Sequence, residues 1–425
     1  MNERLLQFIW QFQYFNRTDL RSVADELVTI LAPGLYNTNQ GPDFLNARIQ
    51  IGSATWAGTV ELHIKTSDWD RHQHQHDQHY NNVILHVVWE ADRPSTNLIP
   101  VVVLKGRVPG VLLHRYENMM YSNSFIPCEK MLHAIPDLTW QAWKDRLLVE
   151  RMLRKSVGVL ELLRQNNFHW EETFWWLLAR NFGSKINADA FEALARSIPI
   201  SILAKQRHQI HQLEALLLGQ GGLLKDNFDD DYARLLQREY LFLRKKYNLQ
   251  PIPFPLLYLR MRPGNFPSLR LAQLAMLIYT SAHLFTIAKE TQELTELVKY
   301  FNVTANDYWH YHYRLGEVSP FKRKNIGQSM IDNVIINSVA PMLFAYGDYH
   351  DEQKFKDKAL CWLLEMRAET NVVTAGFGAL GIKIGSAYDS QALIELKNQY
   401  CDSRRCLDCG VGMALLKQGA ASRER

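Results

Sequence analysis

Three ionisable side chains lie two residues apart on one short segment of this chain, and an acid precedes them. The segment 59–65 alternates apolar and polar residues, which is the period of a half-buried β-strand. Side chains at this spacing share one face of a strand, so Glu61, His63 and Lys65 are predicted to point the same way. Asp43 follows a proline at the head of the preceding segment. Two acids with a nearby base suit a hard divalent cation and a water molecule that attacks a substrate.

These residues predict a catalytic metal site. Asp43 and Glu61 are the expected ligands of Mg²⁺ or Mn²⁺, and either His63 or Lys65 would orient or deprotonate the water. The alternative is that Asp43 belongs to a turn, where Pro-Asp pairs are common, and that Glu61 is a surface residue of a strand.

A histidine-rich stretch follows these acids along the chain. A continuous helix would place His72, His76 and His79 on one face, with Asp77 beside them and His74 pointing elsewhere. Imidazole together with carboxylate suits zinc, iron or manganese better than magnesium. His72, His76 and Asp77 are therefore candidate metal ligands. The alternative is a solvated helix whose histidines bind nothing.

The elements that must position these residues are mainly strands. Residues 48–51 alternate like 59–65, and 83–89 is a nearly continuous apolar run, typical of a strand covered on both faces. His86 lies in this run, either as a core histidine or as a functional one. We predict an α/β or α+β domain over residues 1–130. Its other expected elements are a helix at 3–15, a strand or helix at 20–32, a polar helix at 69–82 and short strands within 93–126.

The rest of the chain is predicted to be a larger all-helical domain, residues 131–425. Asp137 or Thr139 can cap a long helix that runs to about residue 164, because an oxygen of either side chain can accept from the free amides of the first turn. The further helices are expected at 170–181, 187–197, 206–218, 230–246, 269–300, 327–345 and 354–368.

The composition is that of an ordinary folded protein. With 47% hydrophobic residues in 425, the chain can form a sizeable core and two or three domains. The formal net charge of +4 permits an anionic partner without requiring one. The N-terminus lacks the features of a signal peptide and no stretch approaches about eighteen apolar residues, so we expect a cytoplasmic protein without a membrane span. Five cysteines, an odd number, favour a reducing compartment over a disulfide framework.

Two basic spots in the helical region are candidate contacts for phosphate. The second precedes a predicted helix start, where free amides and the helix dipole also favour anions. Phosphate contacts supply most of the non-specific affinity for nucleic acid, which is therefore a candidate partner. The alternative is a solvated basic loop with arginines paired to internal acids. The residues of the two spots are Arg260, Arg262, Arg270, Lys322, Arg323 and Lys324.

The C-terminal region contains a candidate metal site of a different kind. Cys401, Cys406 and Cys409 have the spacing C-x4-C-x2-C, in which neighbouring thiolates can bind one metal. Three thiolates need a fourth ligand, and Cys128 is the first choice. The alternative is a set of free thiols or a redox pair. Cys361 lies in an apolar helix and is predicted to be a core residue.

Two resemblances add to this reading. Pro42-Asp43, followed by Glu61-Leu62-His63 or by Glu61 with Lys65, resembles the PD-(D/E)xK signature of the restriction-endonuclease-like superfamily. This resemblance implies a mixed sheet flanked by helices, metal-dependent cleavage of nucleic acid, and a helix acid, here Glu3, near the metal. Over its whole length the chain also resembles an uncharacterised bacterial family of unknown function, whose members have similar G-P-D-F and V-E-x-H-x-x-x-S-D-W segments.

The cysteines are also similar to the iron–sulfur ligands of some nucleases in the same superfamily. One cysteine lies far upstream and three lie near the C-terminus, although the spacing differs from theirs. The metal of the cysteine site is therefore either zinc or an iron–sulfur cluster.

Three functions fit these observations. The favoured one is a metal-dependent nuclease that hydrolyses phosphodiesters at Asp43 and Glu61, with the helical domain positioning the nucleic acid. The second is a metal-dependent hydrolase of another substrate, centred on the histidines and Asp77. The third is a non-catalytic scaffold that binds nucleic acid or protein and whose acids are structural.

Overall fold

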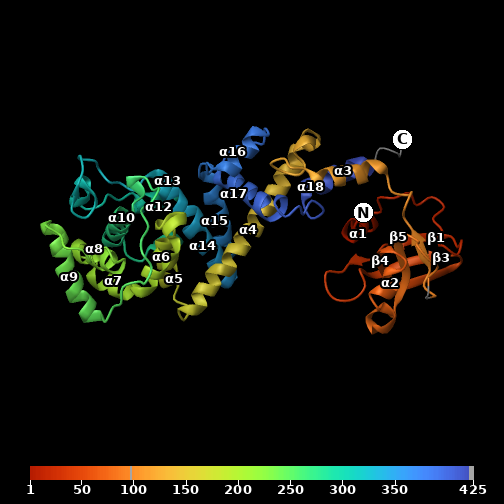
Figure 1. Ribbon diagram of the computed structural model, residues 1–425, viewed down its shortest axis with the longest axis horizontal. Coiled ribbons are helices and arrows are strands. Elements are labelled where there is room, and N and C mark those ends of the chain that lie inside the picture. Colours follow the sequence, from red (N-terminus) through yellow and green to blue (C-terminus); the bar gives the residue numbers. More distant parts are fainter. Residues whose placement is uncertain (96–97, 421–425) are drawn as a thin grey trace. The chain divides into compact units, whose positions relative to one another are not determined.

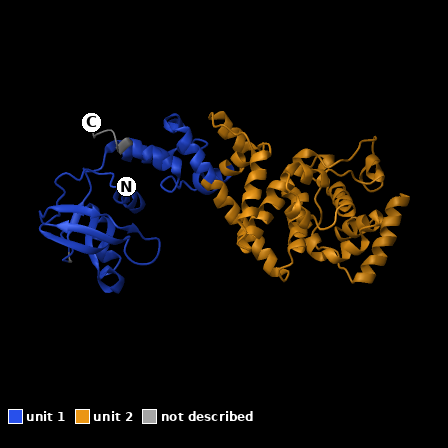
Figure 2. Ribbon diagram, turned by 180° about the vertical axis from the view of Figure 1, so that it is seen from behind, with its two compact units in different colours: residues 1–145, 394–425 blue, residues 146–393 orange. Residues whose placement is uncertain are grey.

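The computed structural model describes residues 1–95 and 98–420 and divides into two compact units (Figures 1 and 2). The first unit consists of Met1–Asp145 together with Ile394–Arg425, and the second consists of Arg146–Leu393. The C-terminal segment with three of the cysteines therefore belongs to the same unit as the N-terminal sheet.

A six-stranded mixed sheet forms the centre of the first unit (Figure 1). The strand order is β1–β3–β4–β5–β6, and β2 also pairs with β3. The β3–β4 pair is antiparallel, whereas β4–β5 and β5–β6 are parallel. The predicted strands at 48–51, 59–65 and 83–89 are confirmed, and 20–32 contains a strand. The bounds are β1 (Val28–Ala32), β2 (Leu35–Tyr36), β3 (Phe44–Ile51), β4 (Ala54–Lys65), β5 (Val83–Glu90) and β6 (Val101–Val103).

Helix α1 (Glu3–Gln11) packs on β4. Its buried face includes Leu5, Leu6 and Ile9, and the side chain of Asn2 caps it by accepting from the Leu5 amide. The helix is shorter than predicted because Gln13 has a φ of 54°, in the left-handed region that does not continue an α-helix.

The segment 69–82 is not one helix, and this prediction was wrong. Helix α2 (Asp68–Arg71) ends after one turn and is followed by two 3₁₀ turns, η1 (His74–His76) and η2 (Gln78–Tyr80). Between α2 and η1, Gln73 has a φ of 60°, which redirects the chain. The histidines therefore do not lie at helical spacing along one face.

The segment 93–126 also departs from the prediction of further strands. It contains the strand β6 and then a twelve-residue helix, α3 (Gly110–Tyr121). The buried residues of α3, Leu112, Tyr116 and Met119, recur at i, i+4 and i+7, which is the period of a helix rather than of a strand.

The second unit is almost entirely helical, as predicted, apart from a short hairpin of β7 (His312–Arg314) and β8 (Glu317–Val318). The predicted helix 269–300 is divided into α10, α11 and α12, and His283 with a φ of 54° marks the first division. The helices from α4 onward, which include π-helical segments η6 and η7, are α4 (Asp137–Gln165), α5 (Trp170–Phe182), α6 (Ser184–Ser197), α7 (Ile200–Gln206), α8 (Ile210–Gln220), α9 (Asp231–Tyr247), α10 (Pro267–Thr280), α11 (Leu284–Glu290), α12 (Leu294–Phe301), α13 (Gln328–Val334), η6 (Ile335–Val339), α14 (Ala340–Tyr349), α15 (Gln353–Glu365), α16 (Val372–Ala379), α17 (Ala387–Glu395), η7 (Leu396–Cys401) and α18 (Gly410–Ala420).

The core of the second unit contains one fully buried carboxyl group, that of Glu214 on α8. It accepts hydrogen bonds from the Tyr232 hydroxyl at 2.8 Å and from the Trp309 indole at 3.1 Å. Burial raises the pKa of Glu214 to about 7, although both hydrogen bonds act in the opposite direction.

Within residues 1–95 and 98–420, no single helix has the length and apolarity needed to cross a membrane. The bent pair α10 and α11 meets that criterion only when the two helices are taken together.

Candidate metal centre

The parallel pairing of β4 with β5 places the candidate residues next to one another. Glu61 lies opposite His86 in this register, and Glu61 and His63 are two residues apart on β4. The predicted shared face is confirmed for these two, because Glu61 Oε1 lies 3.5 Å from His63 Nε2. All three side chains are buried.

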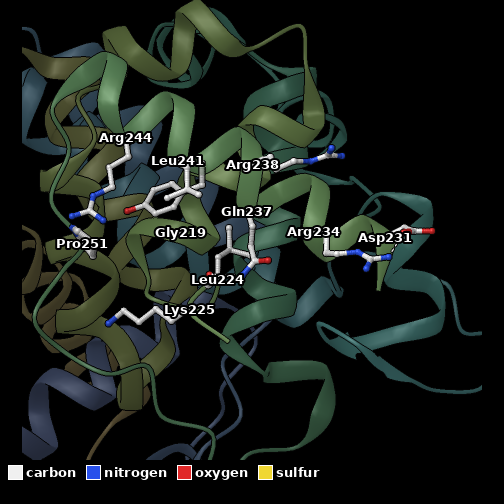
Figure 3. A pocket seen from close by; sticks show the side chains of 11 residues that line it. Gly219, Leu224, Lys225, Asp231, Arg234, Gln237, Arg238, Leu241, Arg244 and Pro251 are labelled. Atoms are coloured by element: carbon white, nitrogen blue, oxygen red, sulfur yellow. Dashed lines mark hydrogen bonds and ion pairs between the residues drawn. The ribbon is translucent and has the colours of Figure 1, made fainter. Parts of the chain in front are cut away.

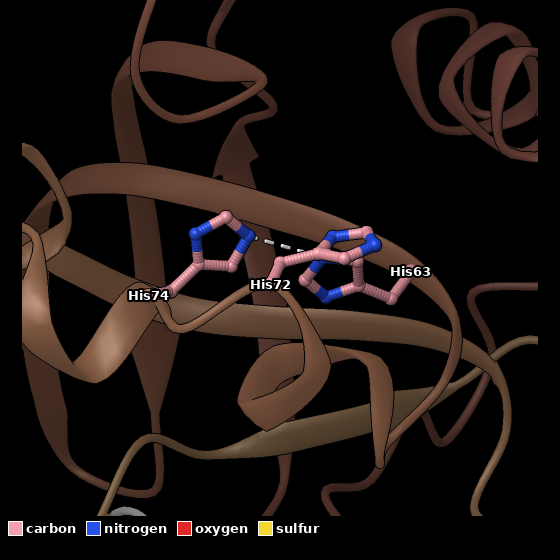
Figure 4. A group of neighbouring side chains, drawn as sticks. All are labelled: His63, His72 and His74. Carbon is pink, nitrogen blue, oxygen red and sulfur yellow. Dashed lines mark hydrogen bonds between the residues drawn. The ribbon is translucent and has the colours of Figure 1, made fainter.

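His72 and His74 join this group from the segment that follows α2 (Figure 4). His63 Nε2 lies 3.2 Å from His72 Nδ1 and 3.3 Å from His74 Nε2. His74 Nε2 is in turn 3.4 Å from Glu61 Oε1. One ligand atom from each of the three histidines lies within 4.8 Å of those of the other two.

This packing suits a cation better than a set of hydrogen bonds. The single atom His63 Nε2 has three electron-rich neighbours within 3.5 Å, and a ring nitrogen carries at most one proton. A tetrahedral zinc ion with bonds of about 2.0–2.1 Å holds its ligand atoms about 3.3–3.4 Å apart. The four observed separations, 3.2 to 3.5 Å, are of this size. They do not include one between Glu61 and His72, and the group whose ligand atoms all lie within 4.8 Å of one another consists of the three histidines. The three imidazoles therefore fit a transition metal, with Glu61 Oε1 close to two of them.

Burial favours the neutral, metal-binding form of three of these histidines, His63, His74 and His86. Burial lowers the pKa of His63 to about 2, and its neighbours His86, His74 and His72 act in the same direction. Burial also lowers the pKa of His86 to about 4 and lowers that of His74. A neutral imidazole keeps the lone pair that a metal ligand needs.

A second layer of contacts orients the ligands. His63 Nδ1 lies 2.9 Å from His86 Nε2, so the nitrogen that faces away from the cluster has a partner of its own. Tyr80 stacks on the His74 ring with centroids 3.8 Å apart, and Trp69 meets the His74 ring edge-on. These contacts fix the direction in which His63 and His74 present their nitrogens.

Asp43 lies beside Glu61 and positions it. The Asp43 amide donates to Glu61 Oε2 at 3.0 Å, which leaves Oε1 facing the imidazoles. Both oxygens of Asp43 are themselves engaged: Gln7 Nε2 donates to one at 2.7 Å and the Leu62 amide to the other at 3.1 Å. The pKa values of Asp43 and Glu61 are raised to about 8, mainly by burial. The charge of Glu61 is the next contribution to the raised pKa of Asp43, and the charge of Glu3 contributes to both. Glu3 is thus close enough to affect the site.

Three of the predicted site residues lie outside the cluster. Lys65 is exposed at the end of β4, and its charge acts on Asp92 rather than on Asp43 or Glu61. His76 is also exposed, and Asp77 forms an ion pair with His79 at 2.7 Å. Sequence reasoning instead missed His74, which would point away from the other histidines if the helix at 69–82 were continuous.

Arg71 is a cation next to the cluster that was also missed. Its guanidinium is exposed, contacts Asp68 at 3.0 Å and lies 3.5 Å from His72 Nε2. Its charge also contributes to the low pKa of His63. An exposed cation at the open side of the cluster is a suitable contact for an anionic substrate.

The basic residues predicted in the helical region are not equivalent. Arg260, Arg262, Lys322 and Arg323 are exposed. Lys324 is only 4% exposed, and its ammonium lies 3.8 Å from the centre of the Tyr313 ring, so the prediction that it contacts phosphate was wrong.

Arg270 lines a pocket of about 370 Å³ together with Arg180 and Lys185. Its guanidinium donates to the neutral side chains of Asn265 and Gln273, and burial lowers its pKa to about 10. Arg180 is paired with Asp189 at 2.7 Å and with Glu192 at 2.8 Å, so Arg270 and Lys185 are the cations that contribute net charge to this pocket.

A larger pocket, about 900 Å³, lies along α9 (Figure 3). Four cations and one acid line it, which is a formal excess of three positive charges, and Arg234 is the cation that pairs with the acid, Asp231. The sequence analysis did not single out these cations. The charged lining residues are Lys225, Asp231, Arg234, Arg238 and Arg244.

The predicted cysteine ligands Cys128, Cys401, Cys406 and Cys409 all belong to the first unit. Cys361 is exposed on α15, so its assignment to the core was wrong.

The fold and the site define a two-unit protein with a mixed sheet, a helical region and a histidine-rich candidate metal centre. The chain belongs to the family described as "Protein of unknown function (DUF2851)", whose model matches residues 3–372. The predicted membership of an uncharacterised family is thereby confirmed. No curated protein and no solved structure matches the chain.

Proposed function

We propose that the first unit is a metal-dependent hydrolase that cleaves phosphodiesters, and hence a nuclease. Its metal would be held by His63, His72, His74 and Glu61. The observation that carries this proposal is the set of ligand-atom separations of 3.2 to 3.5 Å around His63 Nε2 and Glu61 Oε1. Three imidazoles and one carboxylate favour zinc, iron or manganese over magnesium.

The order of elements supports a phosphodiester as substrate. Pro42-Asp43 lies at the start of β3, Glu61 and His63 lie on the antiparallel neighbour β4, and a short helical segment leads to the parallel strand β5. This is the order that the resemblance to the PD-(D/E)xK superfamily implies. His63 occupies the position of that signature's lysine, and in this proposal it is a ligand rather than the base.

The residues divide the chemistry between them. When bound, the metal supplies a water of lowered pKa and polarises a phosphoryl oxygen. Glu61 and the imidazoles hold the metal, Asp43 orients Glu61 through its amide, and His86 orients His63. His72 is the exposed ligand, so substrate would approach on its side, where Arg71 can pair with a phosphate oxygen.

The second unit offers surfaces for the remainder of a nucleic acid. The pocket along α9 and the smaller pocket at Arg270 both carry more cations than acids. Contacts of this kind bind the phosphate backbone without regard to sequence. They support nucleic acid over a small uncharged substrate.

The test is metal-dependent cleavage of labelled single- and double-stranded DNA and RNA with Mn²⁺, Zn²⁺ or Mg²⁺. The chain offers a matched pair of variants, His74→Ala and His76→Ala, because these histidines are two residues apart and only His74 touches the cluster. We expect the first to abolish cleavage and the second to retain it, with both variants folded by circular dichroism.

Cleavage that survives in folded His74→Ala would refute the site. Metal binding by wild type without cleavage of any nucleic acid would favour a hydrolase of another substrate, to which the same donor set is suited. If wild type neither binds metal nor cleaves nucleic acid, the result favours the non-catalytic scaffold.

A further inference from the structure

The second unit contains a cavity of a different kind from the basic pockets at α9 and at Arg270. It measures about 520 Å³ and is walled by α5, α7 and the bend between α10 and α11. Most side chains of its wall are apolar. Cavities of about 300–1,000 Å³ with such a wall are typical binding sites for small molecules. The buried apolar residues of the wall are Phe174, Trp175, Leu178, Leu203 and Leu284.

The bend between α10 and α11 shapes this cavity. Helix α10 ends at Thr280, and α11 begins at Leu284 after His283, whose φ is 54°. The two helices are bent by 62° against each other, and both pack on α5. The break therefore allows both helices to face α5 and to enclose the cavity. Strained backbone of this kind, in the left-handed region at a residue other than glycine, is found preferentially where ligands bind.

One polar group of the wall lacks a partner. Arg207 directly follows α7, and its Nε is buried without a hydrogen-bond acceptor among the residues that the structure describes. A buried donor without a partner costs stability, and the cost is larger when the donor belongs to a charged group. A guanidinium keeps its charge at physiological pH and can bind a carboxylate through two parallel hydrogen bonds. Arg207 is therefore suited to hold the carboxylate of a ligand.

The acid of the wall, Glu171, is engaged elsewhere. Its Oε2 accepts from the Phe285 amide at 3.2 Å, and its Oε1 accepts from the amide and the hydroxyl of Thr286 at 2.7 and 2.8 Å. Both oxygens thus bind the first turn of α11, where a negative charge is favourable, rather than Arg207. The other ionisable residues of the wall are exposed histidines, which add no negative charge. They are His169, His208 and His283.

We propose that this cavity binds a medium-chain carboxylate, a small molecule with one anionic group and an apolar body. The carboxylate would pair with Arg207, and the apolar body would lie against the buried side chains of the wall. Burial of apolar surface supplies affinity, whereas the guanidinium selects acids over neutral molecules of the same shape. The proposal does not depend on the nuclease, because the cavity belongs to the second unit and shares no residue with the histidine cluster.

The test is isothermal titration calorimetry of the full chain with decanoate, and with decan-1-ol as the neutral molecule of equal chain length. Arg207→Gln removes the charge, and Ala204→Trp fills the cavity from an exposed position of the wall. Lys205→Gln is the matched control, because Lys205 is an exposed cation of α7 that is not part of the wall. Circular dichroism reports whether each variant is folded.

We expect wild type to bind decanoate more tightly than decan-1-ol. Arg207→Gln should weaken decanoate binding roughly 10- to 100-fold and leave binding of the alcohol unchanged, because only the acid loses a hydrogen bond to a charged group. Ala204→Trp should weaken the binding of both molecules, and Lys205→Gln should change neither.

Three results would overturn the proposal. The first is no binding of decanoate to wild type, and the second is equal affinity of wild type for the acid and the alcohol. Both are measured without a variant, so they decide the matter even if Arg207→Gln does not fold. The third is unchanged decanoate binding by folded Ala204→Trp, which would place the ligand elsewhere on the chain.

Discussion

A graded loss of metal affinity across three histidines is the strongest consequence of the proposed cluster. His74 contributes a ligand atom 3.3 Å from His63 Nε2, His86 touches only the far nitrogen of His63, and His76 is exposed outside the cluster. The structure therefore predicts three different outcomes for substitutions at three histidines of the same unit.

The magnitudes follow from the role of each side chain. Four-ligand zinc sites bind with about 10–16 kcal/mol, so one ligand corresponds to about 2.5–4 kcal/mol and His74→Ala should weaken binding roughly 10²- to 10³-fold. His86→Phe keeps a ring but removes the hydrogen bond to His63, and loss of such an outer partner costs about 10- to 100-fold. His76→Ala should leave the affinity unchanged.

The assay is titration of metal-free protein with Co²⁺, read by visible absorption. The d–d bands of cobalt bound to nitrogen and oxygen ligands distinguish it from cobalt bound to thiolates, so binding at the histidine cluster is read separately from any binding to cysteine. Circular dichroism confirms that each variant is folded. Equal affinities of His74→Ala and His76→Ala would refute the cluster. A loss at His76 without a loss at His74 would indicate the face of a continuous helix over residues 69–82.

Three further predictions concern other parts of the chain. Arg71→Ala should raise the KM for a nucleic-acid substrate roughly 10-fold with little change in kcat or metal content, because the guanidinium lies at the open side of the cluster. An unchanged KM in steady-state kinetics would exclude a contact between Arg71 and the substrate phosphate. Folding raises the pKa of the Glu214 carboxyl from 4.5 to about 7. The unfolded chain therefore releases this proton at a lower pH than the folded chain does. As the pH rises from about 4.5 to 7, the free energy of unfolding should fall by up to about 3 kcal/mol. Urea melts of wild type and Glu214→Gln across this range should show the decrease in wild type only, and parallel curves would contradict it. Gly412→Ala should destabilise the first unit by about 1–3 kcal/mol in thermal melts, since the new Cβ would lie 2.2 Å from the Cys406 carbonyl oxygen. The control Gly378→Ala changes an exposed helical position with open space around it, so it should be neutral or stabilising in the same assay.

The sequence by itself determined what depends on local periodicity. Alternation along β4 placed Glu61 and His63 on one face, because successive side chains of any strand point to opposite sides. The apolar run of β5 indicated a strand covered on both faces. A long helix was predicted to begin near Asp137 or Thr139, and α4 begins at Asp137.

The tertiary structure alone decided which histidine completes the cluster. His76 shares a helical face with His72 in the sequence pattern, but the left-handed backbone at Gln73 ends the helix and brings His74 to His63 instead. Tyr80 then packs against the His74 ring. No local pattern encodes this path, because it depends on side chains that meet only after the strands β4 and β5 have paired. For the same reason the sequence did not reveal that Lys65 lies outside the site.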